Sequence, residues 1–165
     1  MEPLEWGRIF QEEAKSLHFG HTWQMEFNDT IIPHQQNPGW EQYIRNTSAR
    51  FRCTLCGRTW PSNRVMVIFH MQLIGPTGTV KVRPMRQNCK RCTNAPMVKP
   101  SVESDNIKIL MENLMEKIKI KCYKEKRGPS NKPFRSQEVK SPHEPNHCEG
   151  CEMGICRKEQ GVVTG

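Results

Sequence analysis

The chain has few apolar and aromatic side chains. Of its 165 residues, 35% are hydrophobic and 7% are aromatic, so the core that it can bury is small for its length. No stretch approaches the roughly 18 consecutive apolar residues of a transmembrane helix, and Met1–Arg8 has no apolar segment of the signal-peptide kind. We therefore expect a soluble chain that is not secreted, in a reducing compartment where thiols stay free.

The sequence also lacks the motifs of common catalytic sites. It has no Gly-rich phosphate loop, no nucleophile elbow and no open three-ligand metal site beside a general base. We therefore predict that the protein is not an enzyme, with no catalytic residues, no organic cofactor and no small-molecule substrate.

Cysteine, by contrast, is abundant and regularly spaced. Six of the eight cysteines form three CxxC pairs, which are Cys53/Cys56, Cys89/Cys92 and Cys148/Cys151, and Cys156 follows the last pair. Two thiolates on one tight turn can bind the same metal ion, and two such turns make a tetrahedral zinc site. Bound zinc would also add folding free energy that a small core does not supply.

The first two pairs flank a predicted β-hairpin. Residues 64–74 form an apolar, β-branched run, residues 75–78 read Gly-Pro-Thr-Gly, and residues 79–83 alternate between apolar and polar. A hairpin returns the chain to its start, so the pairs meet across 32 intervening residues. The predicted ligands are Cys53, Cys56, Cys89 and Cys92. Four thiolates indicate structural zinc, whereas a redox CxxC would open a helix in a βαβ unit.

The third pair needs further ligands, and His143 and Cys156 supply them. The set His143, Cys148, Cys151 and Cys156 lies within 14 residues. His147 and His70 are alternatives for the histidine. Two neighbouring residues on one ion would strain the backbone at His147, and a histidine inside an apolar strand is more often a hydrogen-bonded core residue. We expect two structural zinc ions, with a tail of unliganded thiols as the alternative for the second.

The remaining patterns predict an α+β fold. Apolar residues in 4–17 and 105–122 recur at helical spacing, and residues 21–28 alternate as in a half-buried strand. Residues 40–44 predict a short turn or helix. The fold class is a small zinc-stabilised hairpin or sheet domain with an N-terminal helix and a long amphipathic helix. The predicted organisation is a core at 1–125, a flexible basic linker at 126–142, a separate C-terminal zinc knuckle at 143–157 and a disordered tail at 158–165.

Positive charge is concentrated in two segments. The net charge is +8, and residues 81–91 carry five basic and no acidic side chains, while residues 117–140 carry nine basic and two acidic ones. Such clusters indicate an acidic partner, which could be nucleic acid, anionic lipid or an acidic protein face, or else a solvated basic surface. The candidate RNA or acidic-partner contacts are Lys81, Arg83, Arg86, Lys90 and Arg91. Trp60 either shields the first thiolates from water or stacks on a nucleobase.

Several segments together resemble the receptor-transporting proteins, a family with a three-CxxC zinc finger. They are Phe51–Trp60, Val65–Met71, Val80–Arg83, Gln87–Cys92 and Pro142–Cys156. Trp6 with Phe10, Gly39–Tyr43 and the helix at 105–123 are similar as well, so the resemblance covers nearly the whole chain. It is strongest to the third and fourth members of the family.

The resemblance implies an accessory function. Members of this family promote trafficking and cell-surface expression of G-protein-coupled receptors of odorant, taste or opioid type, which they bind directly. The fourth member is an interferon-induced antiviral factor, so an RNA-binding antiviral protein is the alternative. Family members typically carry a C-terminal membrane anchor, and this sequence shows none. The expected location is cytoplasmic, on the cytosolic face of the endoplasmic reticulum or plasma membrane if the full-length form carries an anchor.

Overall fold

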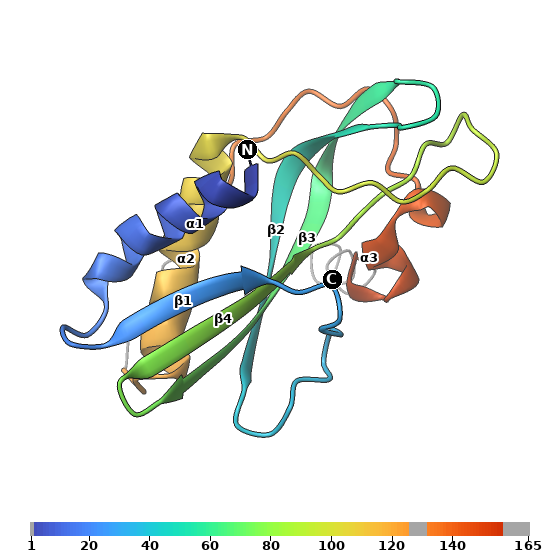
Figure 1. Cartoon of the computed structure of the whole chain (residues 1–165). Helices are drawn as coiled ribbons and strands as arrows, with labels where there is room; N and C mark the ends of the chain where they lie inside the picture. Colours follow the sequence, from blue (N-terminus) through green and yellow to red (C-terminus); the bar gives the residue numbers. More distant parts are fainter. Residues whose placement is uncertain (1, 126–131, 157–165) are drawn as a thin grey trace.

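A computed structural model describes residues 2–125 and 132–156 of the chain (Figure 1). The elements follow one another as α1 (Glu2–Glu13), a 3-10 helix η1 (Ala14–Ser16), β1 (Thr22–Phe27), β2 (Glu41–Arg52), β3 (Thr59–Ile74), β4 (Thr77–Pro84), α2 (Ser104–Lys121), a 3-10 helix η2 (Pro145–His147) and α3 (Glu149–Glu152). The predicted α+β class is confirmed. The predicted disordered tail at 158–165 lies outside the described residues.

The four strands form one mixed sheet in the order β1-β4-β3-β2. β3 and β4 are the predicted hairpin, with Ile74 opposite Thr77, so its turn contains two residues rather than four. Gly75 has a φ of +57°, which suits a two-residue hairpin turn because glycine has no Cβ to clash. β2 pairs antiparallel with β3, and β1 pairs parallel with β4.

Strand β3 is buried on both faces, which explains its continuous apolar run. Val65, Val67 and Phe69 contribute to the main core with the helices, whereas Met66 and Ile68 belong to a second core cluster with Cys148, Ile155 and Cys156. Alternate residues of a strand point to opposite faces. Each face of β3 therefore packs against a different part of the chain.

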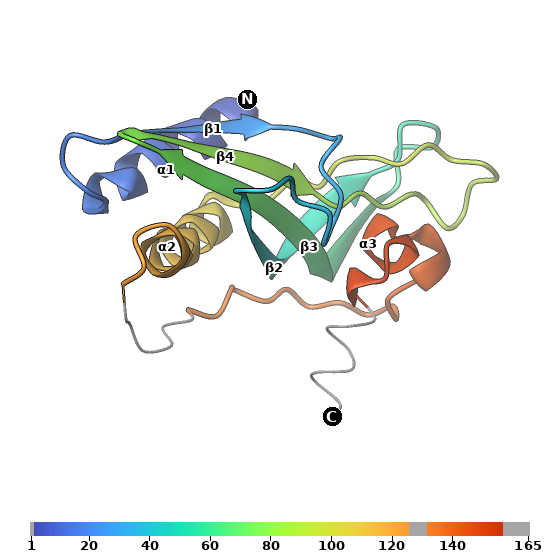
Figure 2. The ribbon, with the colours of Figure 1, turned by 90° about the horizontal axis from the view of Figure 1, so that it is seen from below.

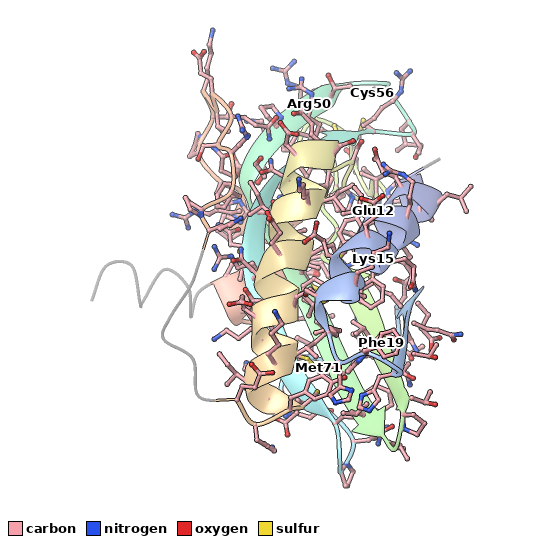
Figure 3. The ribbon with its side chains drawn as sticks, turned by 90° about the vertical axis from the view of Figure 1, so that its left-hand side faces the viewer. Glu12, Lys15, Phe19, Arg50, Cys56 and Met71 are labelled. Atoms are coloured by element: carbon pink, nitrogen blue, oxygen red, sulfur yellow. The ribbon has the colours of Figure 1, made fainter. Side chains whose placement is uncertain are left out.

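Both long helices pack against the main core. The predicted stripe on α2 is buried and consists of Ile107, Leu110, Met111, Leu114, Met115 and Ile118, and α1 adds Trp6, Ile9 and Phe10. Figure 3 shows α1 and α2 side by side in front of the sheet, with Cys56 near one end of the molecule and Phe19 toward the other. In the part of the chain that the structure describes, no helix has the length and apolar character needed to cross a bilayer.

The prediction of a turn or short helix at 40–44 is wrong, because residues 41–44 begin strand β2. Tyr43, Thr47, Ala49 and Phe51 are buried on one side of the strand, and residues 41–52 pair with β3 across one register shift. The alternation is hidden in the sequence because Thr47, on the buried side, is polar and Ile44, on the other side, is apolar. Pairing with a central strand decides the conformation here, as is common for β-structure.

The described part of the predicted flexible linker is held in place. Residues 132–142, here named the strap, run from the region of α2 toward α3 (Figure 2). Asn106 Oδ1 accepts a hydrogen bond from the Arg135 amide at 2.7 Å, and Asn63 Oδ1 accepts one from the Gln137 amide at 2.9 Å. Gln137 Nε2 donates to the Ala49 carbonyl at 2.7 Å. Side chains on distant elements thus satisfy the strap's backbone groups, while residues 126–131 lie outside the described residues.

Two candidate zinc centres

The first centre brings together the four cysteines predicted from the flanked hairpin. All four Sγ atoms lie within 4.8 Å of one another, with 3.8 Å between Cys53 and Cys92 and 3.9 Å between Cys56 and Cys89. A tetrahedral ion with Zn–S bonds of about 2.3 Å requires sulfur atoms about 3.8 Å apart. The thiols therefore already have the spacing of a zinc site.

The turn between β2 and β3 fixes the first pair. The Cys53 amide donates to the Arg58 carbonyl at 2.8 Å and the Gly57 amide donates to the Cys53 carbonyl at 3.0 Å. The Leu55 amide points at Cys53 Sγ at 3.3 Å. Gly57 has a φ of +76°, which favours glycine. The second pair lies in the loop after β4, where Cys89 is buried.

Ionisation of the first centre needs a compensating cation. A hydrogen bond from the backbone of Cys56 lowers the pKa of Cys53 to about 7. The pKa of Cys92 is raised to about 12 by the hydrogen bond between its thiol and the Cys56 side chain, together with burial. The Cys53 thiolate forms readily, and Cys92 ionises only against its negative charge. A divalent cation removes this repulsion, so the donor set suits bound zinc and not an empty cluster.

Trp60 packs against the first centre. It contacts the buried cluster of Cys53, Cys89 and Ala95, and its Nε1 donates to Gln87 Oε1 at 2.8 Å. This agrees with the predicted shielding of the thiolates.

The second centre is formed by His143, Cys148, Cys151 and Cys156, whose ligand atoms also lie within 4.8 Å of one another. Cys148 and Cys156 have their Sγ atoms 3.7 Å apart, and His143 Nε2 lies 3.2 Å from Cys151 Sγ. Cys148 lies between η2 and α3, Cys151 lies in α3 and Cys156 follows α3, while His143 follows the strap. The two clusters fit two zinc ions.

The alternative histidines have other partners. His147 Nδ1 lies 2.8 Å from Asn88 Oδ1, and His70 is buried in β3 with its Nε2 3.1 Å from Gln42 Oε1. Neither belongs to the metal cluster. Burial, followed by the charge of Lys81, lowers the pKa of His70 and so favours its neutral form.

The pKa values of the thiols in the second centre also favour a bound cation. A hydrogen bond from Cys156 lowers the pKa of Cys148 to about 4, while burial raises the pKa of Cys151 to about 11. The hydrogen bond with Cys148, followed by burial, raises the pKa of Cys156. As in the first centre, one thiolate forms easily and the others require bound positive charge.

A buried ion pair fastens the second centre to strand β4, so it is not the separate knuckle that we predicted. Glu149 Oε2 lies 2.9 Å from Arg83 Nη2 and 2.6 Å from Arg86 Nη2, and Glu149 Oε1 accepts from the Arg86 amide at 3.0 Å. Burial alone would raise the pKa of Glu149, but hydrogen bonds from Arg86 and the two positive charges lower it. No pattern in the sequence pointed to this contact.

The five predicted basic contacts therefore differ in accessibility. Arg83 is buried and, like Arg86, pairs with Glu149, so neither side chain is free for a partner. Lys81 lies with its Nζ 4.8 Å from the centre of the Trp40 ring. The remaining two are near the first centre, where the Lys90 Nζ lies 3.8 Å from Glu144 and Arg91 is exposed.

Comparisons with known proteins place this geometry in context. The zinc-binding domain family of three-CxxC zinc ribbons matches residues 46–154. Receptor-transporting protein 3 of Mus musculus is 35% identical over 156 residues, which are 92% of this chain and 33% of that protein. Receptor-transporting protein 2 of Mus musculus is 31% identical over 154 residues, 92% of this chain and 69% of that protein.

Receptor-transporting protein 4 of Mus musculus is 27% identical over 153 residues, which are 90% of this chain and 61% of that protein. The expected likeness to the fourth member is thus weaker than the likeness to the third. The chain spans about a third of the length of the first of these relatives and about two thirds of the other two. No significant match to a solved structure was found.

Proposed function

The chain belongs to the receptor-transporting protein family, and from this premise we propose that it is a zinc-scaffolded accessory protein that promotes the delivery of receptors to the cell surface. The proposed clients are G-protein-coupled receptors of odorant, taste or opioid type, bound directly through their cytosolic segments. The main support for this proposal is the family match. It spans residues 46–154, which include every ligand of the two centres except Cys156.

The two centres support a scaffolding role in place of a catalytic one. Each cluster offers four protein ligands, and four protein ligands fill the tetrahedral shell of zinc and leave no position for substrate. We propose that the protein is not an enzyme and that zinc holds its elements together. We further propose that it works on the cytosolic side of the endoplasmic reticulum or plasma membrane, where free thiols persist.

Surface expression of a client receptor tests the proposed function. An epitope-tagged odorant receptor is expressed in cells with the full-length protein or without it, and its surface level is measured by flow cytometry. We expect a rise that Cys89→Ser abolishes, because Cys89 is a buried ligand of the first centre. Cys122→Ser is the matched control, since Cys122 lies outside both clusters. An unchanged surface level across odorant, taste and opioid receptors would overturn the proposal.

RNA binding is less well supported than receptor binding. The net charge of +8 favours it, but Arg83 and Arg86 are committed to Glu149. Binding to RNA would weaken steeply with added salt if several phosphates were neutralised. Titration of a labelled RNA at two salt concentrations measures this dependence.

A further inference from the structure

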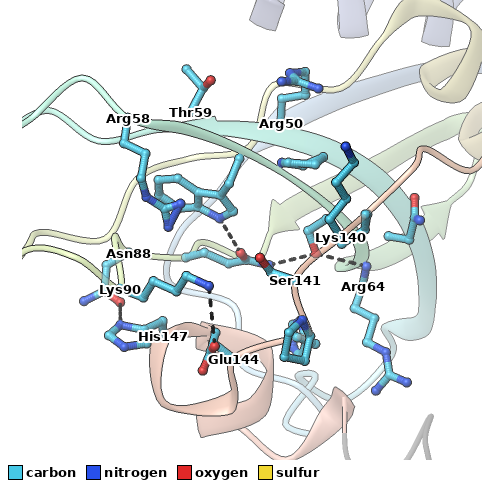
Figure 4. A pocket seen from close by; sticks show the side chains of 18 of the residues that line it. Arg50, Arg58, Thr59, Arg64, Asn88, Lys90, Lys140, Ser141, Glu144 and His147 are labelled. Atoms are coloured by element: carbon cyan, nitrogen blue, oxygen red, sulfur yellow. Dashed lines mark hydrogen bonds and ion pairs between the residues drawn. The ribbon is translucent and has the colours of Figure 1, made fainter.

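A groove adjoins the second zinc centre, whose ligand His143 is among its lining residues, while its other lining residues are ligands of neither centre. Its volume is about 530 Å³, which is within the range of about 300–1,000 Å³ typical of ligand sites. One wall comes from β2 and β3 and the other from the end of the strap, His143, Glu144 and His147. Gln87 and Asn88 also line the groove (Figure 4).

Four of the cationic side chains that line this groove form no ion pair with a carboxylate of the described residues. They are Arg50, Arg58, Arg64 and Lys140, and within residues 2–125 and 132–156 no ion pair involves them. The Nε atom of Arg58 is also buried without a hydrogen-bond partner. Elsewhere several basic side chains are paired, as at Arg83 and Lys132. Buried donors are normally satisfied, so the groove offers unmet positive charge to a ligand.

The groove also has an apolar part, to which Trp60, Pro61 and Val139 contribute. The Trp60 ring stacks on Phe51 with ring centres 5.5 Å apart, and the Arg58 guanidinium lies 4.7 Å from the ring centre. A nucleobase stacking on Trp60 would compete with these contacts. An aliphatic side chain needs no stacking face and could rest against Val139 and the edge of the indole.

We propose that this groove binds an extended peptide segment in which Asp or Glu side chains flank an apolar residue. Arg50, Arg58 and Arg64 would pair with the carboxylates, because guanidinium and carboxylate match in geometry and charge. The inference deepens the proposed function and rests on it, since the segment would be a cytosolic part of a client receptor. Glu138 also lines the groove and repels a continuous polyanion more than a peptide with spaced carboxylates.

The second zinc centre holds one wall of this groove. The strap is fixed at Gln137 by its hydrogen bonds to Asn63 and Ala49, and it leads into His143, a member of the second cluster. Residues 138–142 are therefore anchored on both sides. Loss of the second centre should open the groove without removing its arginines.

Direct peptide binding tests the inference. The probe is a fluorescein-labelled peptide in which Glu and Asp flank a central Leu, and its control carries Gln and Asn instead. Binding to the zinc-loaded full chain is measured by fluorescence anisotropy. Exposed ion pairs contribute up to about a fivefold change in affinity each. With additive effects, the double variant Arg50→Gln/Arg64→Gln should therefore bind more weakly by up to about 25-fold.

The matched control is Arg8→Gln, because Arg8 is exposed on α1 and does not line the groove. Circular dichroism confirms that each variant is folded. The inference is overturned if the amide peptide binds as well as the acidic one, or if Arg8→Gln weakens binding as much as the double variant. It is also overturned if single-stranded oligouridylate displaces the peptide at a lower concentration than unlabelled peptide does.

The two proposals fail in different experiments. If the double variant loses peptide binding and still raises receptor surface expression, the groove is not the receptor site. If peptide binding is specific for the arginines but no receptor reaches the surface in greater amount, the proposed function is wrong and the groove serves another acidic partner.

Discussion

Replacing Glu149 with Gln should destabilise the whole fold, since this carboxylate joins the second zinc centre to β4. The exposed fractions of the Glu149 and Arg83 side chains are 7% and 8%, so water screens their interaction little. Breaking a buried pair by removing one partner costs about 3–5 kcal/mol. Glutamine retains one acceptor oxygen and similar volume, and we therefore expect a loss of about 3 kcal/mol.

Thermal unfolding of the zinc-loaded chain, followed by circular dichroism, measures this loss. A change of about 3 kcal/mol lowers the Tm of a chain of this size by roughly 6–12 °C. Glu144→Gln is the matched control in the same segment. Its pair with Lys90 is 3.8 Å long and 30–41% exposed, so it should cost less than about 1 kcal/mol. Equal melting of the two variants would refute the reasoning.

The effect of Glu149→Gln should also depend on pH. The pKa of Glu149 is lowered in the fold, so its charge stabilises the protein above the unfolded pKa of about 4.3, and this contribution is lost as the pH falls through the folded pKa. The difference between wild type and variant should therefore be full near neutral pH and shrink in acid. A difference that grows with acidification would contradict this assignment.

Three further changes probe the metal centres. Chelation of zinc should abolish cooperative melting and replace the far-ultraviolet circular dichroism spectrum of helix and sheet by that of an unfolded chain, since ligands that are 32 residues apart in the sequence need the ion to stay together. Gly150→Ala should lower the zinc content measured by elemental analysis, because the new Cβ would lie 2.8 Å from Cys156 Sγ, whereas Gly7→Ala meets nothing within 4 Å and should keep it. Cys151→Ser should lower the Tm because it removes a ligand of the second centre, which is part of a core cluster. Its control is Cys122→Ser, which lies outside both clusters and should leave the zinc content unchanged. This view of the second centre is contradicted if Gly150→Ala keeps its full zinc content or if Cys151→Ser keeps its full Tm. It is also contradicted if either control, Gly7→Ala or Cys122→Ser, loses zinc.

Periodicity and spacing were sufficient for the parts of the fold that repeat locally. The apolar stripe of α2 and the hairpin of β3 and β4 both follow from side-chain patterns at helical or alternating spacing. The CxxC pairs gave both ligand sets, because a pair constrains two ligands by itself. The structure places His143, the histidine that was chosen from the sequence, in the second cluster.

The parts that the sequence did not reveal depend on contacts between distant residues. Strand β2 is held by its partner β3, and the strap is held by asparagine side chains such as Asn63 and Asn106. The pair between Arg83 and Glu149 joins residues 66 positions apart. Such polar contacts leave no local period, so a single sequence does not identify them.

The number of zinc ions per chain tests the central claim most directly. Elemental analysis of the purified full chain, with protein concentration from amino-acid analysis, gives this number. Our account predicts two ions, one for each cluster of four ligands. A value of one would leave a cluster without a metal, and a value of zero would contradict the zinc scaffold altogether.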